Sequence, residues 1–216
     1  MRKNKEEKIK EFVKRVLVLV AESLSIDKDQ VLDADRAFPK GQLRGDVIVV
    51  APKQVRDWKI EDIRVLIEAK KKDRILSDLV DGTKGLRHDG KKGLLQLFDE
   101  ALQSLINAKP GTVLYCGVTD GTNWILGKAV AQEFEQVVRR LLKRNKELHA
   151  GERPEMRLSL ATKTYSMAKN EDAKELFEAL RYFLSAQFKL LASADVIDEP
   201  SFDRKSEVSS LFLLSS

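Results

Sequence analysis

The sequence predicts an α/β fold in which a mixed β-sheet of about five strands is flanked by helices. Helices are expected where apolar residues recur at three- and four-residue spacing, over residues 6–24, 94–106, 129–148 and 172–191. Strands are expected where short apolar runs are bounded by turn residues, over residues 43–51, 61–70, 112–118, 123–127 and 156–164. We find no internal repeat, and 216 residues are enough for one domain with a proper core.

Composition is that of an ordinary soluble globular protein, with 43% hydrophobic and 34% charged residues. We expect a single domain over residues 1–195 and a C-terminal tail over residues 196–216, which docks or frays. No apolar run reaches the roughly 18 residues that span a membrane, no signal peptide is indicated, and Cys116 is the single cysteine. These features predict a cytoplasmic protein without a membrane partner. The net charge of +5 is compatible with a polyanionic partner but does not establish one.

The first predicted helix carries an apolar stripe along one face. Its apolar positions are Ile9, Phe12, Val13, Val16, Leu17, Val20 and Leu24. Glu6 lies near the edge of this stripe, so it is the acid of the helix that can face the interior. Residues 25–42 are polar and are broken by Pro39 and Gly41, with room for a short strand around Val31.

The strand over residues 61–70 ends in two charges. Because side chains alternate between the faces of a strand, Glu68 and Lys70 are expected on one face. That face also carries Arg64 and Leu66, and the other carries Ile63, Val65, Ile67 and Ala69. Charges at the end of an apolar strand are costly unless they are paired, metal-bound or solvated. The plain alternative is a strand-end ion pair, worth less than ~1 kcal/mol if it is exposed.

The preceding strand, over residues 43–51, contributes another charge. Asp46 stands at its start, in phase with Ile48 and Val50, and residues 53–60 are typical of a polar hairpin connection. We therefore expect two neighbouring strands to deliver Asp46 from one and Glu68 with Lys70 from the next. The alternative is that Asp46 is a turn residue after Gly45.

Residues 74–93 are expected to be irregular, glycine-rich and basic. A phosphate-contacting loop and a solvated surface loop are both compatible with this composition. The candidate DNA contacts here and directly after Lys70 are Lys71, Lys72, Arg74, Lys84, Arg87, Lys91 and Lys92. Residues 85–92 imitate a nucleotide phosphate-binding loop, but Lys92 occupies the position that requires serine or threonine, so an ATPase is not indicated.

The second half of the chain supplies more helices and strands. In the helix over residues 94–106, Gln96 and Gln103 are expected to point away from the apolar stripe. The strand over residues 112–118 is followed by a turn at residues 120–121 and a hairpin strand that carries Trp124. We expect Trp124 and Cys116 to lie in the core.

An aspartate on one strand followed by Glu-x-Lys at the end of the next resembles the PD-(D/E)XK nuclease superfamily. The matching residues are Gly45-Asp46 and Glu68-Ala69-Lys70. The order of elements is most similar to the N-terminal nuclease region of the restriction subunit of type I restriction enzymes. That order is a leading helix with an acid, the two strands, a helix containing Gln96, and the Thr-Asp-Gly-x-x-Trp hairpin of residues 119–124, together covering roughly residues 6–127. In those relatives a tyrosine commonly follows the helical glutamine at short spacing, where this chain has Phe98 and Asp99.

The resemblance implies a restriction-endonuclease-like core and metal-dependent hydrolysis of phosphodiester bonds. Asp46, Glu68 and the backbone carbonyl of Ala69 would hold Mg²⁺, for which Mn²⁺ can substitute, and oxygen ligands of this kind suit a hard cation. Lys70 would orient the attacking water or stabilise the transition state. Glu6 and Gln96 are the auxiliary candidates.

The expected function is that of a magnesium-dependent DNA endonuclease of restriction type without its own motor. The alternative is a catalytically silent DNA-binding or accessory subunit of a larger restriction, defence or repair complex, and an RNA nuclease is a third candidate. The expected partners are DNA and, within a complex, other restriction–modification subunits. The sequence leaves the oligomeric state open, although a homodimer would supply the two sites that a double-strand cut needs.

Overall fold

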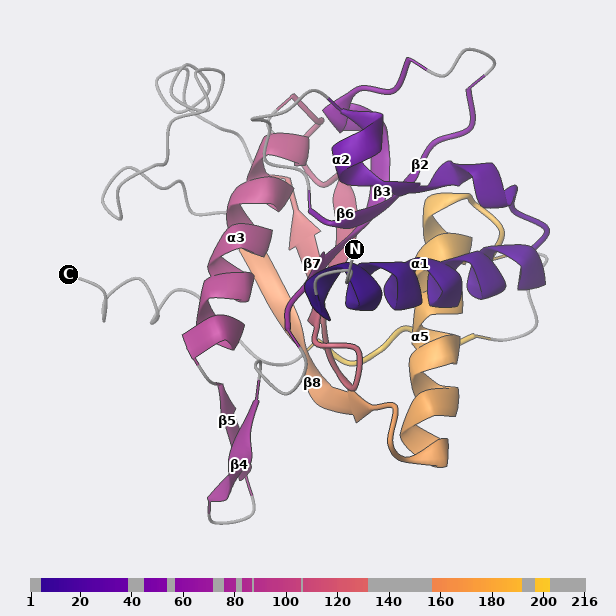
Figure 1. Ribbon diagram of the computed structural model, residues 1–216. Coiled ribbons are helices and arrows are strands. Elements are labelled where there is room, and N and C mark those ends of the chain that lie inside the picture. Colours follow the sequence, from indigo (N-terminus) through magenta and orange to yellow (C-terminus); the bar gives the residue numbers. More distant parts are fainter. Residues whose placement is uncertain are drawn as a thin grey trace.

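A mixed six-stranded sheet forms the centre of the protein, with strand order β1-β2-β3-β6-β7-β8 (Figure 1). The computed structural model describes residues 5–38, 45–53, 57–71, 76–80, 83–86, 88–105, 107–131, 157–191 and 197–202. The sheet strands are β1 (Val31–Asp33), β2 (Val47–Val50), β3 (Ile63–Ala69), β6 (Val113–Thr119), β7 (Asn123–Val130) and β8 (Arg157–Ser166). The main helices are α1 (Lys5–Ser23), α3 (His88–Leu105) and α5 (Asn170–Gln187), with a short α2 (Ala34–Ala37). The α/β class and the mixed sheet are confirmed. This sheet has six strands and not about five, because β1 is added as an edge strand beside β2.

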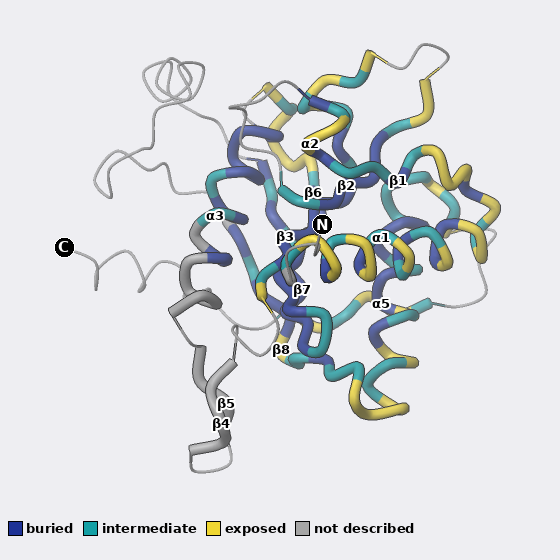
Figure 2. The backbone as a smooth tube through the Cα atoms, viewed as in Figure 1, coloured by how far each residue is buried: buried dark blue, intermediate teal, exposed yellow. Residues whose placement is uncertain are grey.

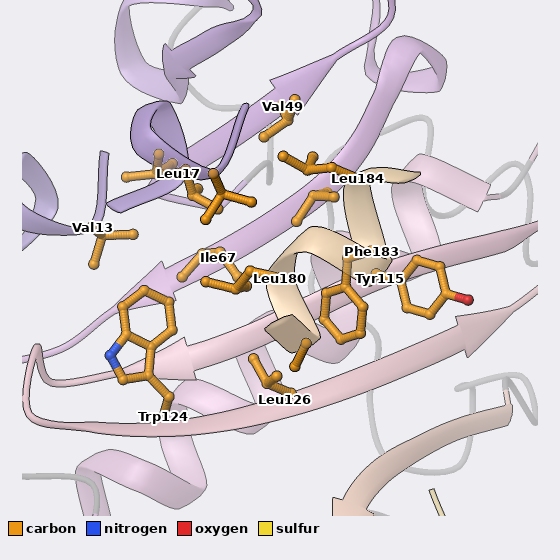
Figure 3. Close-up of a cluster of buried hydrophobic side chains, with 14 of the residues drawn as sticks. Val13, Leu17, Val49, Ile67, Tyr115, Trp124, Leu126, Leu180, Phe183 and Leu184 are labelled. Carbon is orange, nitrogen blue, oxygen red and sulfur yellow. The ribbon is translucent and has the colours of Figure 1, made fainter. Parts of the chain in front are cut away.

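The helices cover the two faces of the sheet. Apolar residues of α3 pack with Ile48 and Leu66 on one face, and those of α1 and α5 pack with Val65 and Ile67 on the other. Figure 2 shows the central strands buried between these layers, and Figure 3 shows the cluster between α1, α5 and the sheet, where Trp124 lies. Trp124 and Cys116 are both fully buried, as predicted.

Strand pairing explains how distant residues meet at one end of the sheet. β2 and β3 are antiparallel neighbours, so the predicted hairpin connection between them is confirmed. β3 and β6 are parallel, and the chain between them passes through α3. The pairs β6–β7 and β7–β8 are antiparallel. The start of β2 and the C-terminal ends of β3 and β6 therefore lie at the same end of the sheet.

Two segments differ from their predicted structure. Residues 74–93 are not irregular throughout, because β4 (Leu76–Val80) and β5 (Thr83–Leu86) form a separate two-stranded sheet and α3 already begins at His88. The helix predicted over residues 129–148 cannot include its first three residues, because β7 continues to Val130 in register with β6 and the Ala131 amide donates to the Thr112 carbonyl oxygen at 2.8 Å. The remainder of that prediction, over residues 132–148, lies outside the described residues.

A β-bulge changes the face on which Ile63 lies. The pairing of β2 with β3 shifts between Val49, opposite Val65, and Val50, opposite Ile63, so that Arg64 is an extra residue. Ile63 consequently packs with the α3 layer, whereas Val65 and Ile67 pack with α1 and α5. The prediction that Ile63 shares a face with Val65 was wrong, because simple alternation does not allow for a bulge.

Part of the predicted tail packs on the domain. The Thr162 amide donates to the Ser201 carbonyl oxygen at 3.0 Å, and Glu199 accepts a hydrogen bond from the Tyr115 hydroxyl at 3.2 Å and pairs with Lys128 at 2.7 Å. Residues 203–216 lie outside the described residues. None of the described helices is long and apolar enough to cross a membrane.

Candidate active site

Asp46, Glu68 and Lys70 are brought together where β2 begins and β3 ends. Val47 lies opposite Ile67 in the antiparallel register, which places Asp46 beside Glu68. The Asp46 amide donates to the Ile67 carbonyl oxygen at 3.1 Å, and its carboxylate Oδ2 accepts from the Ala69 amide at 2.8 Å. The carboxylate of Asp46 is therefore fixed against the backbone that carries Glu68.

Glycine is required at the position before Asp46. Gly45 has φ of +72°, in the left-handed region that favours glycine, and an added Cβ would lie 3.0 Å from Leu66 Cγ. The chain thus turns sharply over β3 as it enters β2. This turn directs the Asp46 side chain toward the end of β3.

Glu68 and Lys70 form a buried ion pair, with Lys70 Nζ 2.5 Å from Glu68 Oε1. The Glu68 side chain is 5% exposed and that of Lys70 is 12% exposed, so the pair differs from the solvated strand-end pair considered above. Burial, followed by the negative charge of Asp46, raises the pKa of Glu68 to about 7, against the opposing effect of Lys70. Glu68 can therefore exchange a proton near neutral pH.

Gln96 of α3 reaches the site, and the expectation that it points away was wrong. Its amide oxygen Oε1 accepts a hydrogen bond from Lys70 Nζ. Gln103, which was also expected to point outward, is 8% exposed. Gln96, Glu100 and Gln103 follow an i, i+4, i+7 spacing, and α3 packs on the sheet over a wider arc than its apolar stripe indicates.

Lys10 of α1 is a site residue that sequence reasoning missed. Its ammonium forms an ion pair with Asp46 Oδ1 and lies 3.5 Å from Asp35 Oδ2. Burial opposes the charge of Lys10, but the hydrogen bond and charge of Asp46 outweigh it and raise the pKa of Lys10. Glu6 is half-buried one helical turn before Lys10, and its proposed role stays a prediction. The spacing from Glu6 to Lys10 was the available signal, since residues four apart share a helix face.

Glu100 is a third buried carboxyl group at the site, also missed from the sequence. It is 5% exposed, and its Oε2 has no hydrogen-bond partner among the described residues. Burial and then the charge of Glu68 raise its pKa well above the ordinary value. Its position four residues after Gln96 was the sequence signal, because a Gln96 that faces the site brings Glu100 with it.

The Thr-Asp-Gly-x-x-Trp hairpin supports the end of β3. The Lys70 amide donates to the Thr119 carbonyl oxygen at 2.7 Å. Asp120 Oδ1 accepts from the amides of Asn123 at 2.7 Å and Thr122 at 3.0 Å, which closes the turn. The hairpin that contributed to the resemblance therefore holds the backbone of Lys70 in place.

The candidate DNA contacts are described only in part. Lys71 is exposed directly after Lys70. Lys72, Arg74 and Arg87 lie outside the described residues. Lys84 on β5 and Lys91 and Lys92 on α3 belong to described elements, but their side chains do not belong to the described part. Their assignment as phosphate contacts stays a prediction.

The arrangement suits a single hard cation held mainly by two carboxylates. Within the described ranges, no group of three or more His, Cys, Asp or Glu side chains is placed to hold a metal ion. Mg²⁺, however, usually takes only one or two carboxylates and completes its shell with water and phosphate oxygens. Asp46 and Glu68 are adjacent, and Asp46 raises the pKa of Glu68, a repulsion that a cation would relieve. The donor set of Asp46, Glu68 and the Ala69 carbonyl therefore fits Mg²⁺.

Comparisons of the chain with protein-family models, curated proteins and solved structures find no match. A functional conclusion therefore depends on the site residues and their geometry.

Proposed function

We propose that this protein is a magnesium-dependent DNA endonuclease with a restriction-endonuclease-like core. The observation that carries the proposal is the convergence of Asp46, Glu68 and Lys70 where β2 begins and β3 ends in the mixed sheet. Two further contacts favour a built site over a chance ion pair. Gln96 binds the ammonium of Lys70, and the Ala69 amide orients the carboxylate of Asp46.

Each residue has a chemical task in phosphodiester hydrolysis. Asp46 and Glu68 would hold Mg²⁺ together with the Ala69 carbonyl, and the ion, when bound, supplies neutralisation of phosphate charge and activation of water. Lys70 is held between Glu68 and Gln96, from where its ammonium can orient a water or stabilise negative charge on the phosphate.

A catalytically silent DNA-binding or accessory subunit is the second candidate function. It is favoured by the partners that Asp46 already has, because its Oδ1 pairs with Lys10 and its Oδ2 accepts from the Ala69 amide. An ammonium that stays on Asp46 would neutralise the carboxylate without any metal. The two functions therefore differ in whether Lys10 yields its place to a cation.

Cleavage of supercoiled plasmid with Mg²⁺ or Mn²⁺ tests the proposal. The wild type should nick or linearise the plasmid, and Glu68→Gln and Lys70→Ala should each reduce cleavage at least about 100-fold. Lys163→Ala is a matched control, because Lys163 forms ion pairs with Asp172 and Glu175 away from the site, and it should cut as the wild type does. A wild type that binds DNA but cuts under neither metal supports the silent subunit, and variants that cut equally well refute the site assignment.

A further inference from the structure

Gly93 lies inside α3, at a position where the backbone does not require glycine. It is the sixth residue of the helix, which begins at His88, and its φ is outside the positive range that favours glycine. Glycine in a helix interior is less favourable than alanine, because it loses more conformational freedom on folding. Glycine is therefore expected here only if a neighbour lies where a side chain would be.

Two side chains from the sheet lie against Gly93. A Cβ added to Gly93 would lie 3.0 Å from Lys70 Cε, 3.4 Å from Lys70 Cγ and 3.0 Å from Val118 Cγ1. A separation of 3.0 Å is shorter than the roughly 3.5–4.0 Å at which carbon atoms attract each other best. The aliphatic stem of Lys70 therefore crosses α3 at Gly93, in space that any other residue would fill.

Lys70 is held at both ends of this stem. Its amide donates to the Thr119 carbonyl oxygen at 2.7 Å, and its ammonium lies 2.5 Å from Glu68 Oε1 and donates to Gln96 Oε1. Gln96 follows Gly93 by three residues and so lies on the same face of α3. A lysine stem usually gives way at little cost, but this one cannot shift without weakening a contact at one of its ends.

We propose that Gly93 is a positioning residue of this site. The absence of a side chain leaves room for the stem of Lys70, so that the ammonium reaches Glu68 and Gln96 together. Gly93 acts through Lys70 and is assigned no contact with substrate or metal. An added Cβ would force a neighbour to move by a few tenths of an ångström, which would displace the ammonium. The consequence for cleavage rests on the proposed nuclease function, whereas the steric relation between Gly93 and Lys70 does not.

A double-mutant cycle, measured by urea unfolding of the metal-free protein, tests the steric relation without an activity assay. Gly93→Ala is made in the wild type and in Lys70→Ala, which lacks the stem, so that the gain in helix propensity is the same in both. Gly93→Ala should be less favourable in the wild type, by at least about fivefold in the unfolding equilibrium constant. Lys163→Ala is the matched control background, because Lys163 also forms ion pairs but on β8, and Gly93→Ala should have its wild-type effect there.

The cycle can overturn the proposal in two ways. Equal effects of Gly93→Ala in the wild type and in Lys70→Ala would show that the stem does not need the space. Failure of Gly93→Ala to fold in both backgrounds would show that the contact with Val118 decides, and it also overturns the proposal. Folding of Gly93→Ala only when Lys70 is truncated supports it.

Plasmid cleavage with Mg²⁺ gives the second readout. Gly93→Ala should lower kcat by about 10- to 100-fold, the scale of a misplaced catalytic group, with the KM for DNA changed less than about threefold. In Val118→Ala, where the second contact is shortened, Gly93→Ala should lower kcat by the same factor. Unchanged kcat in Gly93→Ala overturns the positioning role, and so does a loss of kcat that disappears in Val118→Ala. A wild type that does not cut refutes the nuclease function, and the double-mutant cycle still decides whether Gly93 makes room for Lys70.

Discussion

Replacing Lys10 by methionine tests whether its ammonium occupies the place of a cation at Asp46. The side chains of Lys10 and Asp46 are 19% and 13% exposed, between a surface pair worth less than ~1 kcal/mol and a fully buried pair whose disruption costs about 3–5 kcal/mol. We expect Lys10→Met to lower the free energy of unfolding of the metal-free protein by about 1–2 kcal/mol. For a chain of this length, that loss corresponds to a Tm lower by roughly 2–8 °C.

The same substitution should strengthen metal binding. If Mn²⁺ must displace the ammonium from Asp46, the wild type loses the ion pair on binding, and Lys10→Met does not. A difference of 1–2 kcal/mol then predicts a Kd for Mn²⁺ that is about 5- to 30-fold lower in the variant. Mn²⁺ should accordingly raise the Tm of Lys10→Met more than that of the wild type.

Isothermal titration calorimetry gives the Kd, and thermal unfolding with and without Mn²⁺ gives the stability. Lys163→Met is the control, because it also removes a lysine that pairs with carboxylates, Asp172 and Glu175, but far from Asp46 in the fold. It should leave the Kd for Mn²⁺ unchanged. Equal Mn²⁺ affinity in Lys10→Met and the wild type would refute the reasoning, and so would weaker binding in the variant.

Two further predictions concern Glu68 and Gly45. The folded-state pKa of Glu68 is raised from 4.5 to about 7, so between these pH values the folded protein binds a proton that the unfolded chain has released. The free energy of unfolding of the wild type should therefore fall by roughly 1–3 kcal/mol relative to that of Glu68→Gln as pH rises from about 4.5 to 7.5. Urea unfolding of both proteins across this range measures the difference, and parallel pH profiles would contradict it. Gly45→Ala should destabilise the protein by about 2 kcal/mol or more, because it adds a contact with Leu66 to the strain of positive φ. Gly111→Ala, at φ of +85° with nothing within 4 Å of the added Cβ, should cost only about 1 kcal/mol in the same assay, and equal losses would show that the Leu66 contact is unimportant.

The acidic and basic groups of the site nearly balance within the buried region. Asp46, Glu68 and Glu100 bring carboxyl groups. The ammonium group of Lys10 pairs with Asp46, and that of Lys70 pairs with Glu68. Burial raises the pKa of Glu100 well above its ordinary value. A hard cation added to this set would meet two carboxylates that are already compensated, which is why Lys10 decides between a cutting and a silent site.

Predictions from the sequence succeeded where the determining interactions are local. The alternation of side chains along a strand is a property of the backbone, so Asp46 could be placed in phase with Ile48, and Glu68 in phase with Lys70. The hairpin that joins the two strands is equally local. These two facts were sufficient to predict that the three charged residues meet, and the structure places them together.

Predictions failed where packing over a distance decides the outcome. Gln96 lies outside the apolar stripe of α3, and only the docking of the helix on the sheet turns it toward Lys70. The same docking buries Gln103 and Glu100. The bulge at Arg64 depends on how β2 and β3 pair, and therefore no pattern within β3 alone could reveal the face of Ile63.

The sequence by itself determined the α/β class, the two strands at whose ends Asp46, Glu68 and Lys70 lie, and the burial of Trp124 and Cys116, because periodicity and hydrophobicity act through neighbouring residues. Only the tertiary structure decided that Lys10 pairs with Asp46 and that Gln96 binds the ammonium of Lys70. These contacts join α1 to the start of β2 across 36 residues of sequence and α3 to the end of β3 across 26. Such contacts depend on the packing of helices against the sheet, which leaves no periodic signal in the chain.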